Sequence, residues 1–120
     1  MSETGPSVRQ EPALSVVVAS YNAEQTIQRC LHSLLSQETD EDFEVIVVDS
    51  STDCTAELIE EEFPETRLYR FSERKFCGDA RNIGVSVARS DIIALTDADC
   101  TTARTWVDQI LRAHRPRTWP

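Results

Sequence analysis

Short apolar runs alternate with amphipathic segments along most of this chain, and this alternation limits the possible folds more than any other feature. The runs at 14–19, 44–50 and 91–96 are mostly apolar, and 67–71 alternates apolar and polar residues. Nearly continuous apolar runs are typical of strands that are buried on both faces. The repeat of strand and helix predicts an α/β fold: a doubly wound, mostly parallel, Rossmann-like sheet with helices on both faces.

The segments that follow these runs have apolar residues at helical spacing. The first has the clearest stripe, formed by Ile27, Cys30, Leu31, Leu34 and Leu35. We expect Asn22 to be its N-cap, with Gln25 in the capping-box position. The later stripes are Ala56, Leu58, Ile59 and Phe63; Ala80, Ile83, Gly84, Val87 and Ala88; and Trp106, Val107, Ile110 and Leu111.

The length of 120 residues suits a single domain. We expect a flexible lead-in over 1–12, a domain over 13–114 and a tail over 115–120. The net charge of −9 argues against a nucleic-acid partner, which would need a basic surface. The lead-in lacks a signal-peptide pattern and no apolar run is long enough to cross a membrane, so a cytoplasmic location is expected. A place at the inner face of the membrane is left open for a longer form.

The cysteines do not form a metal or disulfide pattern. Cys30, Cys54, Cys77 and Cys100 include no CxxC pair, and the histidines are not at zinc-ligand spacing. We expect free thiols, two or three of them partly buried.

Polar residues follow three of the predicted strands, at 20–22, 49–53 and 97–99. Ligands of open α/β sheets bind beyond the carboxyl ends of the strands, so these clusters are expected at one ligand-binding edge. Asp97 and Asp99 are two apart in an extended segment and therefore project from the same face. Paired carboxylates suit Mg²⁺ or Mn²⁺, although a solvated strand end is the alternative.

Other residues near this edge could bind a nucleotide. Tyr21 could present its aromatic face to a ligand or simply pack against its neighbours. Asp49 could accept a hydrogen bond from a base or sugar, or it could cap the next helix. Arg81 and Asn82 lie in the first turn of the third helix, where Arg81 could instead form a surface ion pair. With only three glycines, a GxGxxG or Walker loop is impossible, so phosphate binding would depend on the metal with an Arg or a helix N-terminus.

The segments "LSVVVASYNAEQTIQRCLHSLLSQ", "EVIVVDSSTDCTAELI" and "GDARNIGVSVARSDIIALTDADC" together resemble family 2 glycosyltransferases of the GT-A fold. The resemblance runs from Leu14 to Leu111. It implies an enzyme that binds a nucleotide-diphosphate sugar, such as a UDP- or GDP-sugar, with Mg²⁺ or Mn²⁺. The sugar would pass with inversion to an acceptor hydroxyl, and the acceptor is unknown.

The resemblance also implies roles for individual residues. Ala19, Tyr21 and Asn22 in "ASYN" would hold the nucleobase together with Asp49. Arg81 would lie near the base and phosphates.

The resemblance further implies that Asn82 and Gly84 shape the pocket wall. Asp97 would contact the ribose or a metal-bound water, and Asp99 would bind the metal that bridges the diphosphate.

The chain departs from the family pattern at Ser50, where a second aspartate is frequent, and at Ser90, where glycine is usual. The family's acceptor site and catalytic base lie in its second half, so no residue here is assigned as the base. We therefore expect a truncated, donor-binding half of such an enzyme. The alternatives are a nonenzymatic or degenerate nucleotide-sugar-binding fragment and, less favoured, a flavodoxin-like signalling domain, which would need an acidic pair where Ser20–Asn22 stand.

Overall fold

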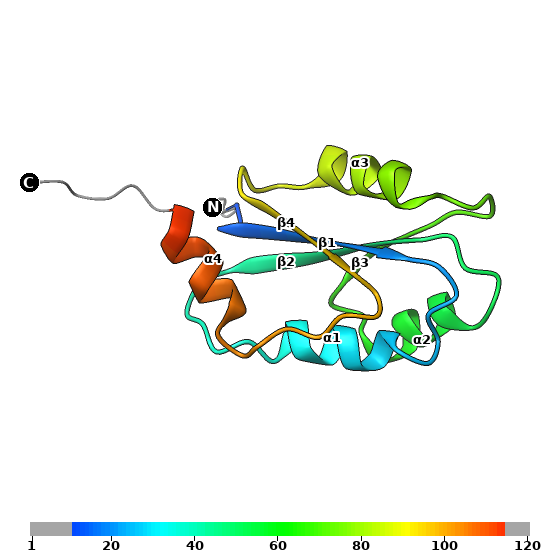
Figure 1. Cartoon of the computed structure of the whole chain (residues 1–120), viewed down its shortest axis with the longest axis horizontal. Helices are drawn as coiled ribbons and strands as arrows, with labels where there is room; N and C mark the ends of the chain where they lie inside the picture. Colours follow the sequence, from blue (N-terminus) through cyan, green and yellow to red (C-terminus); the bar gives the residue numbers. More distant parts are fainter. Residues whose placement is uncertain (1–10, 115–120) are drawn as a thin grey trace, which may run out of the picture.

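Strands and helices alternate strictly along the chain, as the sequence predicts (Figure 1). The computed structural model describes residues 11–114, so the expected lead-in up to residue 10 and the tail 115–120 lie outside the described residues. The elements are β1 (Leu14–Ser20), α1 (Ile27–Leu35), β2 (Phe43–Asp49), α2 (Thr55–Glu62), β3 (Arg67–Arg70), α3 (Cys77–Val87), β4 (Ile93–Asp97) and α4 (Trp106–His114). Among residues 11–114, no helix combines the length and the apolar character that a membrane span requires.

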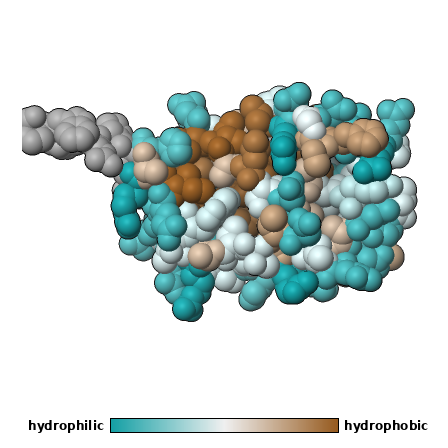
Figure 2. Space-filling view, in the orientation of Figure 1, coloured by the Kyte–Doolittle hydropathy of each residue, from teal (hydrophilic) through white to brown (hydrophobic). Residues whose placement is uncertain are grey.

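The four strands form one sheet in the order β3-β2-β1-β4, and all pairings are parallel. Helix α3 lies over one face, whereas α1 and α2 lie over the other (Figure 1). This arrangement confirms the predicted doubly wound α/β class. Figure 2 shows apolar side chains gathered on the side where β4 runs, and Leu95 of β4 keeps 47% of its surface exposed.

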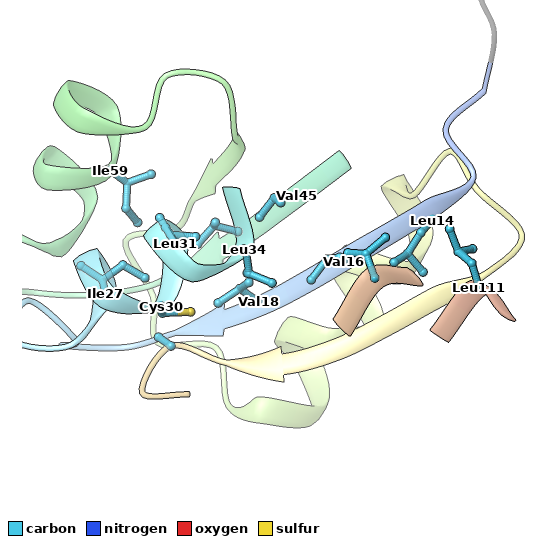
Figure 3. Packing of buried hydrophobic residues seen from close by; sticks show 13 residues of the cluster. Leu14, Val16, Val18, Ile27, Cys30, Leu31, Leu34, Val45, Ile59 and Leu111 are labelled. Carbon is cyan, nitrogen blue, oxygen red and sulfur yellow. The ribbon is translucent and has the colours of Figure 1, made fainter. Parts of the chain in front are cut away.

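Alternating side chains divide the core between the two faces of the sheet. On one face, Val16 and Val18 pack with the predicted stripe of α1, including the fully buried Leu31 (Figure 3). On the other face, Val17 packs with residues of β2 and with Ala80 of α3. Full burial of one such Val or Leu side chain stabilises the fold by roughly 1.5–3 kcal/mol.

Helix α3 lies unusually close to β1 because Gly84 has no side chain. A Cβ atom at Gly84 would lie 2.2 Å from Cγ1 of Val17, which is impossible without movement of one of the two elements. Gly84, which the resemblance assigns to the pocket wall, therefore faces the sheet and fixes the spacing between α3 and β1.

The start of α1 differs from the expectation. Asn22 is not the N-cap: Thr26 holds that position without a side-chain hydrogen bond, so the capping box with Gln25 is also wrong. Asn22 instead adopts a positive φ of 49°, and its Oδ1 accepts hydrogen bonds from the backbone N–H groups of Thr52 and Asp53 at 2.8 and 3.3 Å. The amide thus joins the turn after β1 to the turn after β2.

Hydrogen bonds also tie the strands together at the opposite, amino end of the sheet. Glu44 accepts them from Ser15, Arg67 and the Arg89 backbone. Ser90, where the family usually has glycine, donates its hydroxyl to the carbonyl of Ala13 at 2.9 Å. The substitution at Ser90 is therefore accommodated far from the carboxyl ends of the strands.

Candidate functional site

Strand register brings the three polar clusters to one edge of the sheet. Ala19 pairs with Asp97, and Ser20 pairs with Asp49. Beyond the last pairs, the N–H of Ala98 donates to Ala19 O at 3.2 Å, and the N–H of Ser50 donates to Ser20 O at 3.2 Å. The chain segments after β1, β2 and β4 are thus held side by side, as the sequence predicts.

A cleft of roughly 630 Å³ opens at this edge, a volume within the range of small-ligand sites. Its walls come from the end of β1 and the turn after it, the end of β4, and the segments that precede α2 and α3. It is lined by Ala19, Tyr21, Asn22, Ala23, Glu24, Gln25, Thr26, Asp53, Arg74, Cys77, Asp97, Ala98 and Asp99.

The acidic pair lies on the wall that β4 contributes. Ligand atoms of Asp97, Asp99 and Cys100 all lie within 4.8 Å of one another, close enough to share one metal ion. Asp97 also forms an ion pair with Arg81, with Nη2 and Oδ1 at 3.3 Å. Two carboxylates suit a hard divalent cation, whereas the Cys100 thiol is a softer donor.

The backbone of this acidic segment is held by its neighbours. The Thr26 hydroxyl donates to Ala98 O at 3.0 Å, and the Cys30 thiol donates to Asp97 O at 3.6 Å. Burial, and then the nearby Cys100, Asp99 and Asp97, raise the pKa of Cys30 to about 12. Cys30 is thus a neutral hydrogen-bond donor beneath the segment.

The remaining cysteines do not share this environment. Cys30 is buried, but Cys54, Cys77 and Cys100 are exposed, and all four are free thiols. The expectation of free thiols is confirmed, whereas the expectation that two or three are partly buried is wrong. The three exposed cysteines, Cys54, Cys77 and Cys100, lie at or next to turns, where helical periodicity does not predict whether a side chain is buried.

One aromatic ring and one guanidinium, those of Tyr21 and Arg74, line the cleft, and the ring of Phe76 lies against the guanidinium. The Arg74 Cζ atom lies 3.9 Å from the ring centroid of Tyr21 and 4.5 Å from that of Phe76. Both rings are exposed, Tyr21 by 38% and Phe76 by 61% of their surface. Such distances are typical of cation–π contacts, so the three side chains form one stack.

Asp53 contributes a further carboxylate to the lining. Its Oδ1 accepts a hydrogen bond from the Thr55 backbone N–H at 3.0 Å and one from the Thr55 hydroxyl. Burial acts to raise the pKa of Asp53, but these bonds, together with the Glu24 backbone N–H, outweigh burial and lower it. Asp53 is therefore ionised at neutral pH and holds the start of α2.

Three of the residues expected at the site do not line the cleft. Asp49 is buried, and its two carboxylate oxygens accept hydrogen bonds from the Ser51 hydroxyl at 2.6 Å and the Ser51 N–H at 3.1 Å. Arg81 reaches the site only through its ion pair with Asp97. Asn82 is exposed on α3.

The alternation of side chains explains why Asp49 stands apart. In β2, Val45 and Val47 face α1, and Asp49 continues that face of the sheet. In β4, Ile93 packs on the face of α3, and Asp97 continues that face. The two carboxylates therefore reach the same edge from opposite faces.

The sequence interpretation missed several lining residues, above all Arg74, Glu24 and Cys77, and it placed Asp53 at this edge without assigning it a role. The segment "RKF" at 74–76 combines cations with an aromatic residue, which could have drawn attention to Arg74. Its contact with Tyr21 joins residues that are far apart in the chain, so no local pattern indicates it.

The fold and the cleft together define an α/β domain of the kind that binds ligands at the carboxyl ends of parallel strands. A family model described as "Glycosyl transferase family 2" matches residues 15–116, so the chain belongs to glycosyltransferase family 2.

Individual relatives agree with this assignment. The chain is similar to the succinoglycan biosynthesis protein ExoO of Rhizobium meliloti, with 37% identity over 97 residues, covering 80% of this chain and 28% of ExoO. TarS 1–349 of S. aureus, solved in complex with UDP, superposes with a TM-score of 0.74 at 28% identity, covering 80% of this chain and 30% of that piece of TarS.

A third relative is the mannosyltransferase PcManGT of Pyrobaculum calidifontis, solved with GDP-Man and Mn²⁺. It superposes with a TM-score of 0.68 at 32% identity, covering 87% of this chain and 32% of PcManGT. The chain thus spans 28% of the length of ExoO, 32% of PcManGT and 18% of the longer TarS chain. The structures of TarS and PcManGT are GT-A glycosyltransferases, as the sequence resemblance implied.

Proposed function

We propose that this domain binds the nucleotide-diphosphate part of a sugar donor together with Mg²⁺ or Mn²⁺, as the donor site of a glycosyltransferase. The observation that carries the proposal is the convergence of the Asp97 and Asp99 carboxylates on the cleft at the carboxyl edge of the sheet. The complexes of TarS with UDP and of PcManGT with GDP-Man and Mn²⁺ support it, since both proteins share this fold.

The residues present fit a divalent cation. Two carboxylates within 4.8 Å supply hard oxygen ligands, and one face of each remains open to solvent because Asp97 and Asp99 are only partly covered. Such ions keep several waters and bind through one or two carboxylates plus phosphate oxygens. When bound, the ion would offset the charge that develops on the departing nucleoside diphosphate.

The protein's own residues would orient the donor. Ala19, Tyr21 and Asn22 line the cleft and would contact the nucleobase. Arg81 would act on the donor through Asp97, because its ion pair fixes the direction of that carboxylate. Asp49 is hydrogen-bonded to Ser51, and Ser51 accepts the backbone N–H of Asn22. These bonds favour a role for Asp49 in holding the turn after β2.

The transfer itself would be an inverting displacement by an acceptor hydroxyl. This step needs a general base within hydrogen-bonding reach of that hydroxyl. We assign no described residue as the base. The proposal for this chain is therefore donor binding, and sugar transfer is proposed for the protein as a member of its family.

Calorimetric titration with UDP and GDP, with and without Mn²⁺, tests the proposal. We expect one of the two nucleotides to bind in the presence of Mn²⁺ and to lose most of its affinity when the ion is chelated. Asp99→Ala should abolish the Mn²⁺-dependent part, because the exposed Asp99 supplies an ion ligand and holds no core element.

Asp91→Ala is the matched control, because it removes one exposed carboxylate at the amino end of β4, away from the cleft. Unchanged Mn²⁺-dependent binding in Asp99→Ala, or an equal loss in Asp91→Ala, would contradict the assignment of the metal site. Circular dichroism should show the same fold for the wild type and both variants.

A further inference from the structure

Arg74 is the cationic residue among the side chains that line the cleft. The described lining also includes four acidic residues: Glu24, Asp53, Asp97 and Asp99. A nucleoside diphosphate is itself an anion, so an acidic cleft repels it unless positive charge lies nearby. A divalent ion would offset Asp97 and Asp99 but would leave the diphosphate with little direct attraction to the protein.

The other nearby arginine is already engaged. Arg81 is paired with Asp97 at 3.3 Å and does not line the cleft. The Arg74 guanidinium, in contrast, makes its contacts with the rings of Tyr21 and Phe76, and it has no carboxylate partner among the described residues. Its N–H donors are thus available to a ligand.

The two rings restrict where this guanidinium can go. It is stacked between Tyr21 on the turn after β1 and Phe76 at the start of α3. Planar guanidinium groups stack well on aromatic faces. A guanidinium that is already restrained loses less conformational entropy when it binds an anion. The stack therefore presents a partly ordered cation at the cleft.

The backbone directly after Arg74 is anchored at two points. The N–H of Lys75 donates to the buried Ser50 hydroxyl at 2.8 Å. The carbonyl of Phe76 accepts the N–H of Ala80 at 2.8 Å in the first turn of α3. Ser50, where the family frequently has aspartate, thus fixes the segment that holds the cation.

We propose that Arg74 binds the diphosphate of the donor nucleotide and that Tyr21 and Phe76 hold its guanidinium ready to do so. This inference rests on the proposed function and adds a binding residue to it. Arginine pairs with phosphate oxygens through charge-assisted, frequently bidentate hydrogen bonds. Arg74 would thus discriminate nucleoside diphosphates from uncharged nucleosides.

Titration of Arg74 variants of the 120-residue chain tests the inference, with UDP, GDP, uridine and guanosine as probes in the presence of Mn²⁺. Arg74→Ala should weaken binding of the preferred nucleoside diphosphate by about 10- to 100-fold, the range expected for hydrogen bonds to a charged group. Binding of the corresponding nucleoside, followed by ligand-detected NMR, should stay within about twofold. Arg74→Lys should recover part of the diphosphate affinity, since lysine keeps the charge but not the planar fork.

Two further variants separate the role of the stack from net charge. Phe76→Ala removes one ring of the stack and keeps the cation, so it should weaken diphosphate binding less than Arg74→Ala. Arg89→Ala is the control for charge, because Arg89 is exposed between α3 and β4 at the amino end of the sheet. It should leave the affinity for every probe unchanged.

The outcomes distinguish this inference from the function on which it rests. If the wild type binds a nucleoside diphosphate and Arg74→Ala binds it equally well, the inference on Arg74 is wrong and the proposed function stands. An equal loss for nucleoside and nucleoside diphosphate also contradicts it, because the effect would not depend on phosphate. A wild type that binds neither UDP nor GDP overturns the proposed function and this inference together.

Discussion

Single residues differ widely in how freely they can react, and the cysteines show this most clearly. Cys30 lies under the acidic segment with 1% of its surface exposed, whereas Cys100 lies on that segment in solvent. The two thiols are thus close in space and opposite in environment. Burial removes the thiolate of Cys30 from water, which raises its pKa to about 12, and reactivity of a thiol requires the thiolate.

We therefore predict that Cys30 is inert to a thiol reagent at pH 8 in the folded chain. Titration with a chromogenic disulfide should modify Cys54, Cys77 and Cys100 rapidly, and the fourth thiol only after denaturant is added. Cys30→Ala provides the check. It should remove the thiol that reacts only after denaturant is added and leave the three rapidly reacting thiols unchanged. Rapid modification of all four thiols in native buffer would show that Cys30 is accessible.

The local sequence predicts residue types at the site better than residue contacts. Asp97 and Asp99 were expected on one face of an extended segment. The strand instead ends at Asp97, and Asp99 lies in a turn in which the Cys100 N–H donates to Asp97 O at 3.0 Å. This turn, rather than strand alternation, brings their ligand atoms together. The contact of Asn22 with Thr52 could not be predicted in this way, because it crosses between two turns. Asp49 shows the same limit: its position at the edge was predictable, but the face from which it arrives depends on strand register.

At the scale of elements, the contact of α3 with β1 depends on a single missing side chain. Gly84→Ala should destabilise the fold by about 1–3 kcal/mol, the usual cost of an extra methyl in a packed interface. The reason is the 2.2 Å approach of its Cβ to Val17 Cγ1 in the centre of the sheet. The midpoint of urea unfolding measures the effect.

Gly78→Ala is the matched control in the same helix, because a Cβ there meets nothing within 4 Å. Alanine is the better helix former, so this change should raise stability by about 0.5–1 kcal/mol. Similar unfolding midpoints for the two variants would mean that α3 does not lie as close to β1 as described.

Helices and strands were the most predictable part of this molecule. The predicted strands correspond to β1, β2, β3 and β4 within a few residues. In β1 and β2 the apolar run is nearly continuous because burial on both faces leaves little room for polar side chains. The start of α1 was mispredicted because Asn22 and Gln25 have the residue types of a capping box, and a longer-range partner engages Asn22 instead.

At the scale of the whole molecule, the parallel sheet gathers all strand ends at one edge and separates them from the amino ends. The described residues extend over 51 × 38 × 25 Å, so a ligand at one edge is well removed from the other. Parallel strands place all their carboxyl ends at the same edge of the sheet, which is why the edge was predictable. The shape of the cleft was not, since it depends on loops such as the one that carries Arg74.

The central claim is that a divalent ion and a nucleoside diphosphate bind together at the carboxyl edge of the sheet. Paramagnetic broadening of backbone amide signals by Mn²⁺ in the presence of UDP or GDP measures the position of the ion directly. We predict strong broadening at Tyr21, Asp99 and Cys100, and sharp signals at Phe43 and in the acidic loop 40–42 at the amino edge. Broadening centred on that loop, with sharp signals at Asp99 and Cys100, would contradict the claim.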